Sequence, residues 1–155
     1  VIIGDVTIGE GCWIGPNVSV RGDMNKITIG DKSNLQDNVV VHGETTLGAY
    51  SHIGHAAILH GPTLGEHVLV AINAIILDGT TIGDGCVIAA GSVVAPRAEI
   101  PPFKMVMGVP ASIVADVPMS RAEAGSEDEG YLSFPYRYPD GLIELTLDEA
   151  KGLSH

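Results

Sequence analysis

Aliphatic residues recur at every sixth position along most of this chain, and this period constrains its fold more than any other feature of the sequence. The period extends from Ile2 to Val106 and comprises 18 repeats. The residue directly after each aliphatic one is often glycine, and the fourth residue after it is usually small or β-branched. The aliphatic positions are Ile2, Ile8, Ile14, Val20, Ile29, Leu35, Val41, Leu47, Ile53, Leu59, Leu64, Val70, Ile76, Ile82, Ile88, Val94, Ile100 and Val106.

A period of six, with one large and one small inward residue, fits a short strand followed by a corner. Three such units close a triangular coil of about 18 residues. An amphipathic helix would need a period of about 3.6 residues, and the turns of a β-sandwich come about every 8 to 12 residues. We therefore predict an all-β fold, a parallel solenoid of hexapeptide repeats over residues 1–115.

Two breaks interrupt the period. Nine residues instead of six separate Val20 from Ile29, so residues 21–26 should contain a three-residue loop. Five residues separate Leu59 from Leu64, which should tighten one corner. Irregularities in a solenoid map to loops on one face, and that face often binds ligands.

The composition changes after the last repeat. Residues 116–155 contain 9 acids against 3 bases, including the run Glu127-Asp128-Glu129. This part is typical of an acidic linker. Beyond it, residues 131–138 are rich in aromatic residues, Pro139-Asp140-Gly141 is a turn signal, and residues 142–147 alternate. We predict that residues 116–155 form an acidic linker and a C-terminal hairpin tail.

Charge and hydropathy exclude several classes of partner. The formal net charge of -11 would repel a phosphate backbone, so we expect neither nucleic acid nor an anionic membrane as a partner. No uninterrupted apolar run approaches the roughly 18 residues that span a bilayer, and no basic segment precedes an apolar one as in a signal peptide.

Cys12 and Cys86 lie four coils apart by the repeat register, too far for a disulfide. We expect a cytoplasmic protein.

The repeat register places two histidines side by side. His42 follows Val41 and His60 follows Leu59, 18 residues or one coil later. Adjacent coils pair like neighbouring strands about 4.8 Å apart, so both rings can converge on one metal ion. We name the three sides of the triangle A, C and B in chain order. Side A carries Val20, Val41, Leu59, Ile76 and Val94, and side B carries Leu35, Ile53, Val70 and Ile88.

A third histidine, His55, lies on the preceding side of the same coil. An extended residue spans about 3.3 Å, which puts His55 roughly 15 Å from His60, whereas zinc binds a nitrogen at about 2.0 to 2.1 Å. One chain therefore cannot supply all three ligands, but two subunits can. Head-to-tail contacts close into a ring, and a triangular prism suggests a threefold one. We predict that His42, His55 and His60 bind a metal within a homotrimer.

At these positions the sequence resembles the gamma-class carbonic anhydrases and their close hexapeptide-repeat relatives. The resemblance covers about residues 1–115 and implies a left-handed β-helix. It also implies a trimer that binds metal at each subunit interface, and a role for Arg21 and Asp23 in joining subunits near the site. The matching stretches are Val20-Arg21-Gly22-Asp23, Asn34-Leu35-Gln36-Asp37 followed by Val41-His42, and His55-Ala56-Ala57-Ile58-Leu59-His60-Gly61.

The resemblance implies the reversible hydration of carbon dioxide to bicarbonate. Three neutral imidazoles leave a position open on zinc, as catalytic sites do, and they suit iron(II) and cobalt(II) equally. By its register, Gln36 lies beside Asp37 under His55, where its amide could bond a metal-bound water or bicarbonate. Asn34 belongs to the same motif. Glu44 is the only acid near the short loop after His42, and is the candidate proton shuttle.

Some family members carry a glutamate where this chain has Met24, which leaves other functions open. Hexapeptide acyltransferases that use acetyl-CoA share the solenoid and an ending like Gly108-Val109-Pro110-Ala111. Such an enzyme needs a general-base histidine and a basic groove, for which Arg97 and Lys104 are the late bases. A non-catalytic, metal-binding trimeric assembly subunit is a third possibility. We interpret the remaining ladder histidines, His52 and His67, as solvated.

Overall fold

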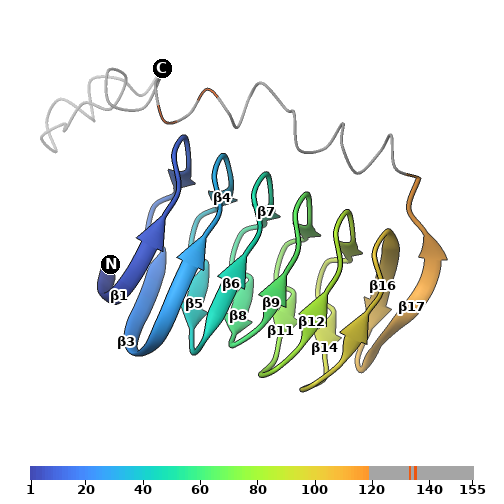
Figure 1. Cartoon of the computed structure of the whole chain (residues 1–155). Helices are drawn as coiled ribbons and strands as arrows, with labels where there is room; N and C mark the ends of the chain where they lie inside the picture. The colour runs from blue at the N-terminus through green and yellow to red at the C-terminus, as the bar shows by residue number, and fades with distance from the viewer. Residues whose placement is uncertain (119–132, 134, 136–155) are drawn as a thin grey trace, which may run out of the picture.

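The computed structural model describes residues 1–118 together with residues 133 and 135. Residues 1–118 form a left-handed parallel β-helix in which short strands coil around one axis (Figure 1). The predicted all-β solenoid is therefore confirmed. Apart from residues 133 and 135, the predicted linker and hairpin tail from residue 119 onward lie outside the described residues.

Strand β3 (Ser19–Ile29) passes from side A to side C, so one ladder of strands runs over both sides. Strand β1 (Ile2–Ile8) pairs with β3 at the N-terminal end of the stack. The other strands of side A are β5 (Val40–His42), β8 (Ile58–His60), β11 (Ile75–Ile76) and β14 (Val93–Val94). The other strands of side C are β6 (Thr45–Leu47), β9 (Thr63–Leu64), β12 (Thr81–Ile82) and β15 (Glu99–Ile100).

Side B is a separate parallel sheet that an antiparallel strand extends at its C-terminal end. That last strand, β17 (Ala111–Asp116), pairs with β16 (Lys104–Gly108), and the Val109-Pro110 bond between them is cis. The strands of side B are β2 (Trp13–Ile14), β4 (Asn34–Leu35), β7 (His52–Ile53), β10 (Leu69–Val70), β13 (Val87–Ile88), β16 (Lys104–Gly108) and β17 (Ala111–Asp116).

The aliphatic residues of the repeat stack on one another in the predicted register and form the core. On side A, Val41 pairs with Leu59, and Leu59 with Ile76. All three are fully buried, and each such side chain contributes about 1.5 to 3 kcal/mol relative to exposure. Some of the small inward positions hold buried serine or threonine, whose hydroxyl groups bond backbone atoms of a neighbouring coil. Ser33 Oγ, for example, donates to the Gly48 carbonyl at 3.1 Å and satisfies it inside the corner.

Both predicted breaks in the period are confirmed. Gly4 pairs with Gly22 and Val6 pairs with Ile27, so a single residue of β1 faces the four residues 23–26 of β3. Strand β3 therefore contains three residues more than β1 at this point. The chain bends around the corner within β3, and the insertion is exposed there. The later corner is shorter by one residue, because His42 pairs with His60 while Thr46 pairs with Thr63.

The two cysteines are free thiols, as predicted from their separation. Burial raises the pKa of both the Cys12 and the Cys86 thiol. Each Sγ lies 3.1 Å from a backbone carbonyl oxygen, which fits a structural role. In the described part of the chain, no helix combines the length and the apolar character that crossing a membrane requires.

Candidate metal centre

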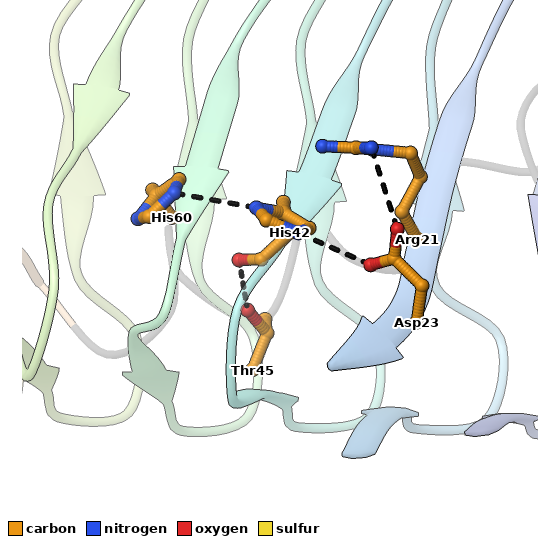
Figure 2. Close-up of polar contacts among 5 residues, drawn as sticks. All are labelled: Arg21, Asp23, His42, Thr45 and His60. Carbon is orange, nitrogen blue, oxygen red and sulfur yellow. Dashed lines mark hydrogen bonds and ion pairs between the residues drawn. The ribbon is translucent and has the colours of Figure 1, made fainter. Parts of the chain in front are cut away.

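His42 and His60 lie side by side at the corner between sides A and C. They end the paired strands β5 and β8 and are register partners. Nδ1 of His42 lies 3.3 Å from Nε2 of His60, and the ring planes are inclined by 65° (Figure 2). Two nitrogens bound to one tetrahedral ion at about 2.0 to 2.1 Å are themselves about 3.3 to 3.4 Å apart. The two rings therefore have the spacing of two ligands of one ion.

The second nitrogen of His42 faces a carboxylate. Its Nε2 lies 3.2 Å from Oδ1 of Asp23, and the other oxygen of Asp23 lies 3.4 Å from Nη1 of Arg21 (Figure 2). A carboxylate accepts the Nε2 proton and leaves Nδ1 of His42 as the ligating atom. Thr45, buried in the corner, donates its hydroxyl to the His42 carbonyl at 3.3 Å and fixes the strand end.

The second nitrogen of His60 also faces a carboxylate. Nδ1 of His60 lies 2.8 Å from Oδ1 of Asp78, which follows it by 18 residues. This contact leaves Nε2 of His60 directed at His42. Asp78 is not among the site residues predicted from the sequence. The available signal was its spacing, because a residue 18 positions on lies one coil further along the same corner.

His55 lies at the opposite corner of side A, between β7 and β8, and its side chain is 47% exposed. Its Nδ1 lies 2.9 Å from Oδ2 of Asp37 in the preceding coil. Within the described residues, no group of three or more His, Cys, Asp or Glu side chains is placed to hold a metal ion by itself. One chain thus supplies a pair of imidazoles at one corner and a single imidazole at the other.

Gln36 and Asn34 lie on the side of the molecule that leads to His55. The Gln36 amide donates to Oδ1 of Asn34 at 3.2 Å, and the Asn34 amide donates to Nδ1 of His52 at 2.7 Å. All three residues are buried. The interpretation of His52 as solvated is therefore wrong, because Asn34 in the preceding coil gives its ring a buried polar partner. His67 is half-buried and stacks on Tyr50, with ring centroids 5.1 Å apart.

A cleft of about 540 Å³ lies over the two paired rings. The insertion in β3 contributes one wall and the loop after β5 another. Glu44, the candidate proton shuttle, is exposed and belongs to the wall formed by the loop after β5. The lining includes Met24, Asn25, His42, Glu44, His60 and Asp78.

These residues fit a divalent transition-metal ion. Imidazole nitrogen is a preferred ligand of zinc, iron(II) and cobalt(II). In metal sites the second nitrogen of a ligating histidine is usually bonded to a carboxylate or a carbonyl. In His42, His55 and His60 alike, one ring nitrogen lies within 3.2 Å of a carboxylate oxygen. The donor set and its supporting residues therefore both match a metal centre.

Known hexapeptide-repeat proteins match this chain by sequence and by structure. The family model described as bacterial transferase hexapeptide (six repeats) matches residues 61–96, and the hexapeptide repeat of succinyl-transferase matches residues 5–42. A probable carbonic anhydrase of Methanocaldococcus jannaschii is 46% identical over 121 residues, which are 76% of this chain and 76% of that protein.

Two further similarities extend over most of the chain. The carnitine operon protein CaiE of Proteus sp. (strain LE138) is 38% identical over 151 residues, covering 94% of this chain and 77% of that protein. The crystal structure of a hexapeptide transferase family protein from Anaplasma phagocytophilum superposes with a TM-score of 0.84 and 34% identity, covering 88% of this chain and 84% of that one.

Proposed function

The chain belongs to the hexapeptide-repeat family, and on that premise we propose that it is a gamma-class carbonic anhydrase. It would hydrate carbon dioxide reversibly to bicarbonate, at a metal site shared by two subunits of a homotrimer. Members of the family are enzymes, which supports catalysis in general. The probable carbonic anhydrase from M. jannaschii supports this particular reaction.

The observation that carries the proposal is the set of three histidine–carboxylate pairs. The pairs join Asp23 with His42, Asp37 with His55 and Asp78 with His60. In each pair the carboxylate bonds one ring nitrogen, so the other is available to a metal ion. Three similar pairs, one at each histidine that the sequence predicted as a ligand, are best explained by a common ligand.

The surface of side A supports the sharing of the site between subunits. Its outward column is aliphatic and half-buried, whereas the outward column of side C consists mainly of threonine. An apolar face between the His55 corner and the corner of His42 and His60 is suited to packing against another subunit. Such packing would bring the third imidazole to the pair. The aliphatic column is Val40, Ile58, Ile75 and Val93.

Zinc, iron(II) or cobalt(II) would supply the acidity of the site; zinc held by three imidazoles, for example, lowers the pKa of a coordinated water to about 7. The chain's own residues would orient and desolvate the reactants. Asp23 holds His42 in its ligating tautomer. Glu44 lines the cleft and is exposed, so its carboxylate can carry a proton to solvent. Gln36 and Asn34 form a fixed amide chain toward the His55 corner.

Acyl transfer is the second candidate, because the matching family models and the A. phagocytophilum structure carry transferase names. A groove for coenzyme A phosphates requires available cations. Among the described residues late in the solenoid, the Lys104 ammonium group is paired with the Asp116 carboxylate and Arg97 is exposed. One exposed guanidinium supports a groove for coenzyme A phosphates less well than the three histidine–carboxylate pairs support hydration.

The proposal is tested by measuring carbon dioxide hydration after anaerobic loading with iron(II) and, separately, with zinc. We expect hydration by the wild-type protein and its loss in His42→Ala. His67→Ala is the control, because His67 is a ladder histidine that stacks on Tyr50. Metal binding without hydration would instead support the assembly subunit, and specific binding of acetyl-CoA would support the acyltransferase.

A further inference from the structure

We propose that Asp78 is a positioning residue of the metal centre, which holds His60 in the tautomer that directs Nε2 at the ion. The inference deepens the proposed function and rests on it for the presence of the ion. Asp78 lies outside the sequence motifs that pointed to the site. Its role follows from its contact with His60, from the shape of the corner between them and from its place in the cleft wall.

The contact defines the tautomer of His60. Oδ1 of Asp78 lies 2.8 Å from Nδ1 of His60, and an ionised carboxylate only accepts hydrogen bonds. The proton of neutral His60 is therefore held at Nδ1. The lone pair of Nε2 then points toward Nδ1 of His42, 3.3 Å away. Because the bond made by one ring nitrogen sets the state of the other, Asp78 controls what His60 offers to the ion.

The corner after His60 is shaped to admit this carboxylate. Gly61 has φ +71, in the left-handed region, and a Cβ placed on it would lie 3.1 Å from Oδ1 of Asp78. The N–H of Gly79 donates to the Gly61 carbonyl at 3.0 Å and holds the two coils together at this point. A side chain at residue 61 would press on the carboxylate. The backbone thus leaves room for Asp78 against the ring.

The exposure of Asp78 favours a role in orientation over one in stability. Its side chain is 64% exposed and that of His60 is 42% exposed. Exposed ion pairs contribute little to folding because water screens them. Fixing the tautomer and the plane of a ligating ring has a larger effect, and loss of such a partner typically lowers metal affinity about 10- to 100-fold.

The first test reads the tautomer without any metal. Long-range ¹H–¹⁵N spectra of the apo protein near pH 8.5 should show His60 protonated at Nδ1 in the wild type. Asp78→Ala should move the proton partly or wholly to Nε2, and loss of the signal in His60→Ala assigns it. Asp84→Ala is the matched control, because Oδ1 of Asp84 bonds the Glu66 N–H in another corner. An unchanged His60 tautomer in Asp78→Ala overturns the proposal.

The second test measures cobalt(II) affinity and the visible cobalt(II) spectrum by competition with a chromophoric chelator. We expect a 10- to 100-fold weaker affinity in Asp78→Ala, a smaller loss in Asp78→Asn, whose amide oxygen still accepts a bond, and no change in Asp84→Ala. In a His60→Ala background, Asp78→Ala should add no further loss. An equal loss in both backgrounds overturns the proposal, since Asp78 would not act through His60. If the wild type binds no cobalt(II), the proposed function fails, and the tautomer measurement still decides whether Asp78 orients His60.

Discussion

At the scale of single residues, a chain of buried amides supports the corner that carries His55. Gln36 donates to Asn34, and Asn34 donates to His52. The next residue after Gln36 is Asp37, the carboxylate that bonds His55. Buried donors and acceptors without partners cost about 1 to 3 kcal/mol each. This chain therefore favours a single position for the corner.

Asn34→Ala should break the chain in its middle. We expect the free energy of unfolding to fall by about 1 to 3 kcal/mol, because the Gln36 amide loses its acceptor and Nδ1 of His52 loses its donor. Urea denaturation measures the change. Thr81→Ala is the control, since Thr81 is exposed on side C. Equal stability of the two variants would show that the amide chain contributes nothing.

Only part of the site could be predicted from single residues in the sequence. The approach of His42 to His60 follows directly from an 18-residue spacing, because one coil has that length. Asp78 has the same spacing from His60, but exposed carboxylates occur at many positions of the solenoid, so the spacing alone does not single it out. The burial of His52 depends on its neighbour Asn34 in the preceding coil, which no local pattern around His52 reveals.

At the scale of elements, the insertion in β3 serves the site. Residues 23–26, which contain the three extra residues, face one residue of β1 and are all exposed. The insertion brings Asp23 against His42 and places Met24 in the wall of the cleft. Extra residues in strands are common beside functional sites, where they redirect side chains. The period alone predicted the position and length of the insertion, but which side chain it presents to His42 depends on the bend within β3.

Deleting residues 24–26 should separate stability from metal binding. The free energy of unfolding should change by less than about 1 kcal/mol, because the deleted residues bury no core. Cobalt(II) affinity should fall about 10- to 100-fold, because the corner would draw the Asp23 carboxylate away from His42. Calorimetry and chelator competition measure the two quantities. Asp23→Ala is the matched control and should reproduce the affinity loss; a deletion variant with wild-type affinity would contradict this role.

At the scale of the whole molecule, the solenoid was predictable because its repeat length equals one side of the triangle. Each aliphatic residue then stacks on the one three repeats away, as Leu35 does on Ile53. The handedness did not follow from the period and came from the resemblance to known proteins. A single chain also leaves His55 apart from the other two histidines, so the proposed three-histidine site requires an assembly of subunits. This requirement can be tested without a structure of the proposed trimer.

Mixed trimers test whether the three histidines belong to one site. Trimers of His55→Ala chains alone, or of His42→Ala chains alone, should bind metal poorly at every interface, because each interface lacks one ligand. Unfolding and refolding the two variants together should restore binding, since an intact His55 on a His42→Ala chain can meet the intact pair on a His55→Ala chain. The opposite mixed interface loses both ligands, so each mixed trimer regains at most one site. Metal content per trimer measures the recovery, and mass spectrometry confirms that chains have exchanged. If exchanged mixtures bind no more metal than either variant alone, the site is not shared between subunits and the proposed enzyme activity loses its structural basis.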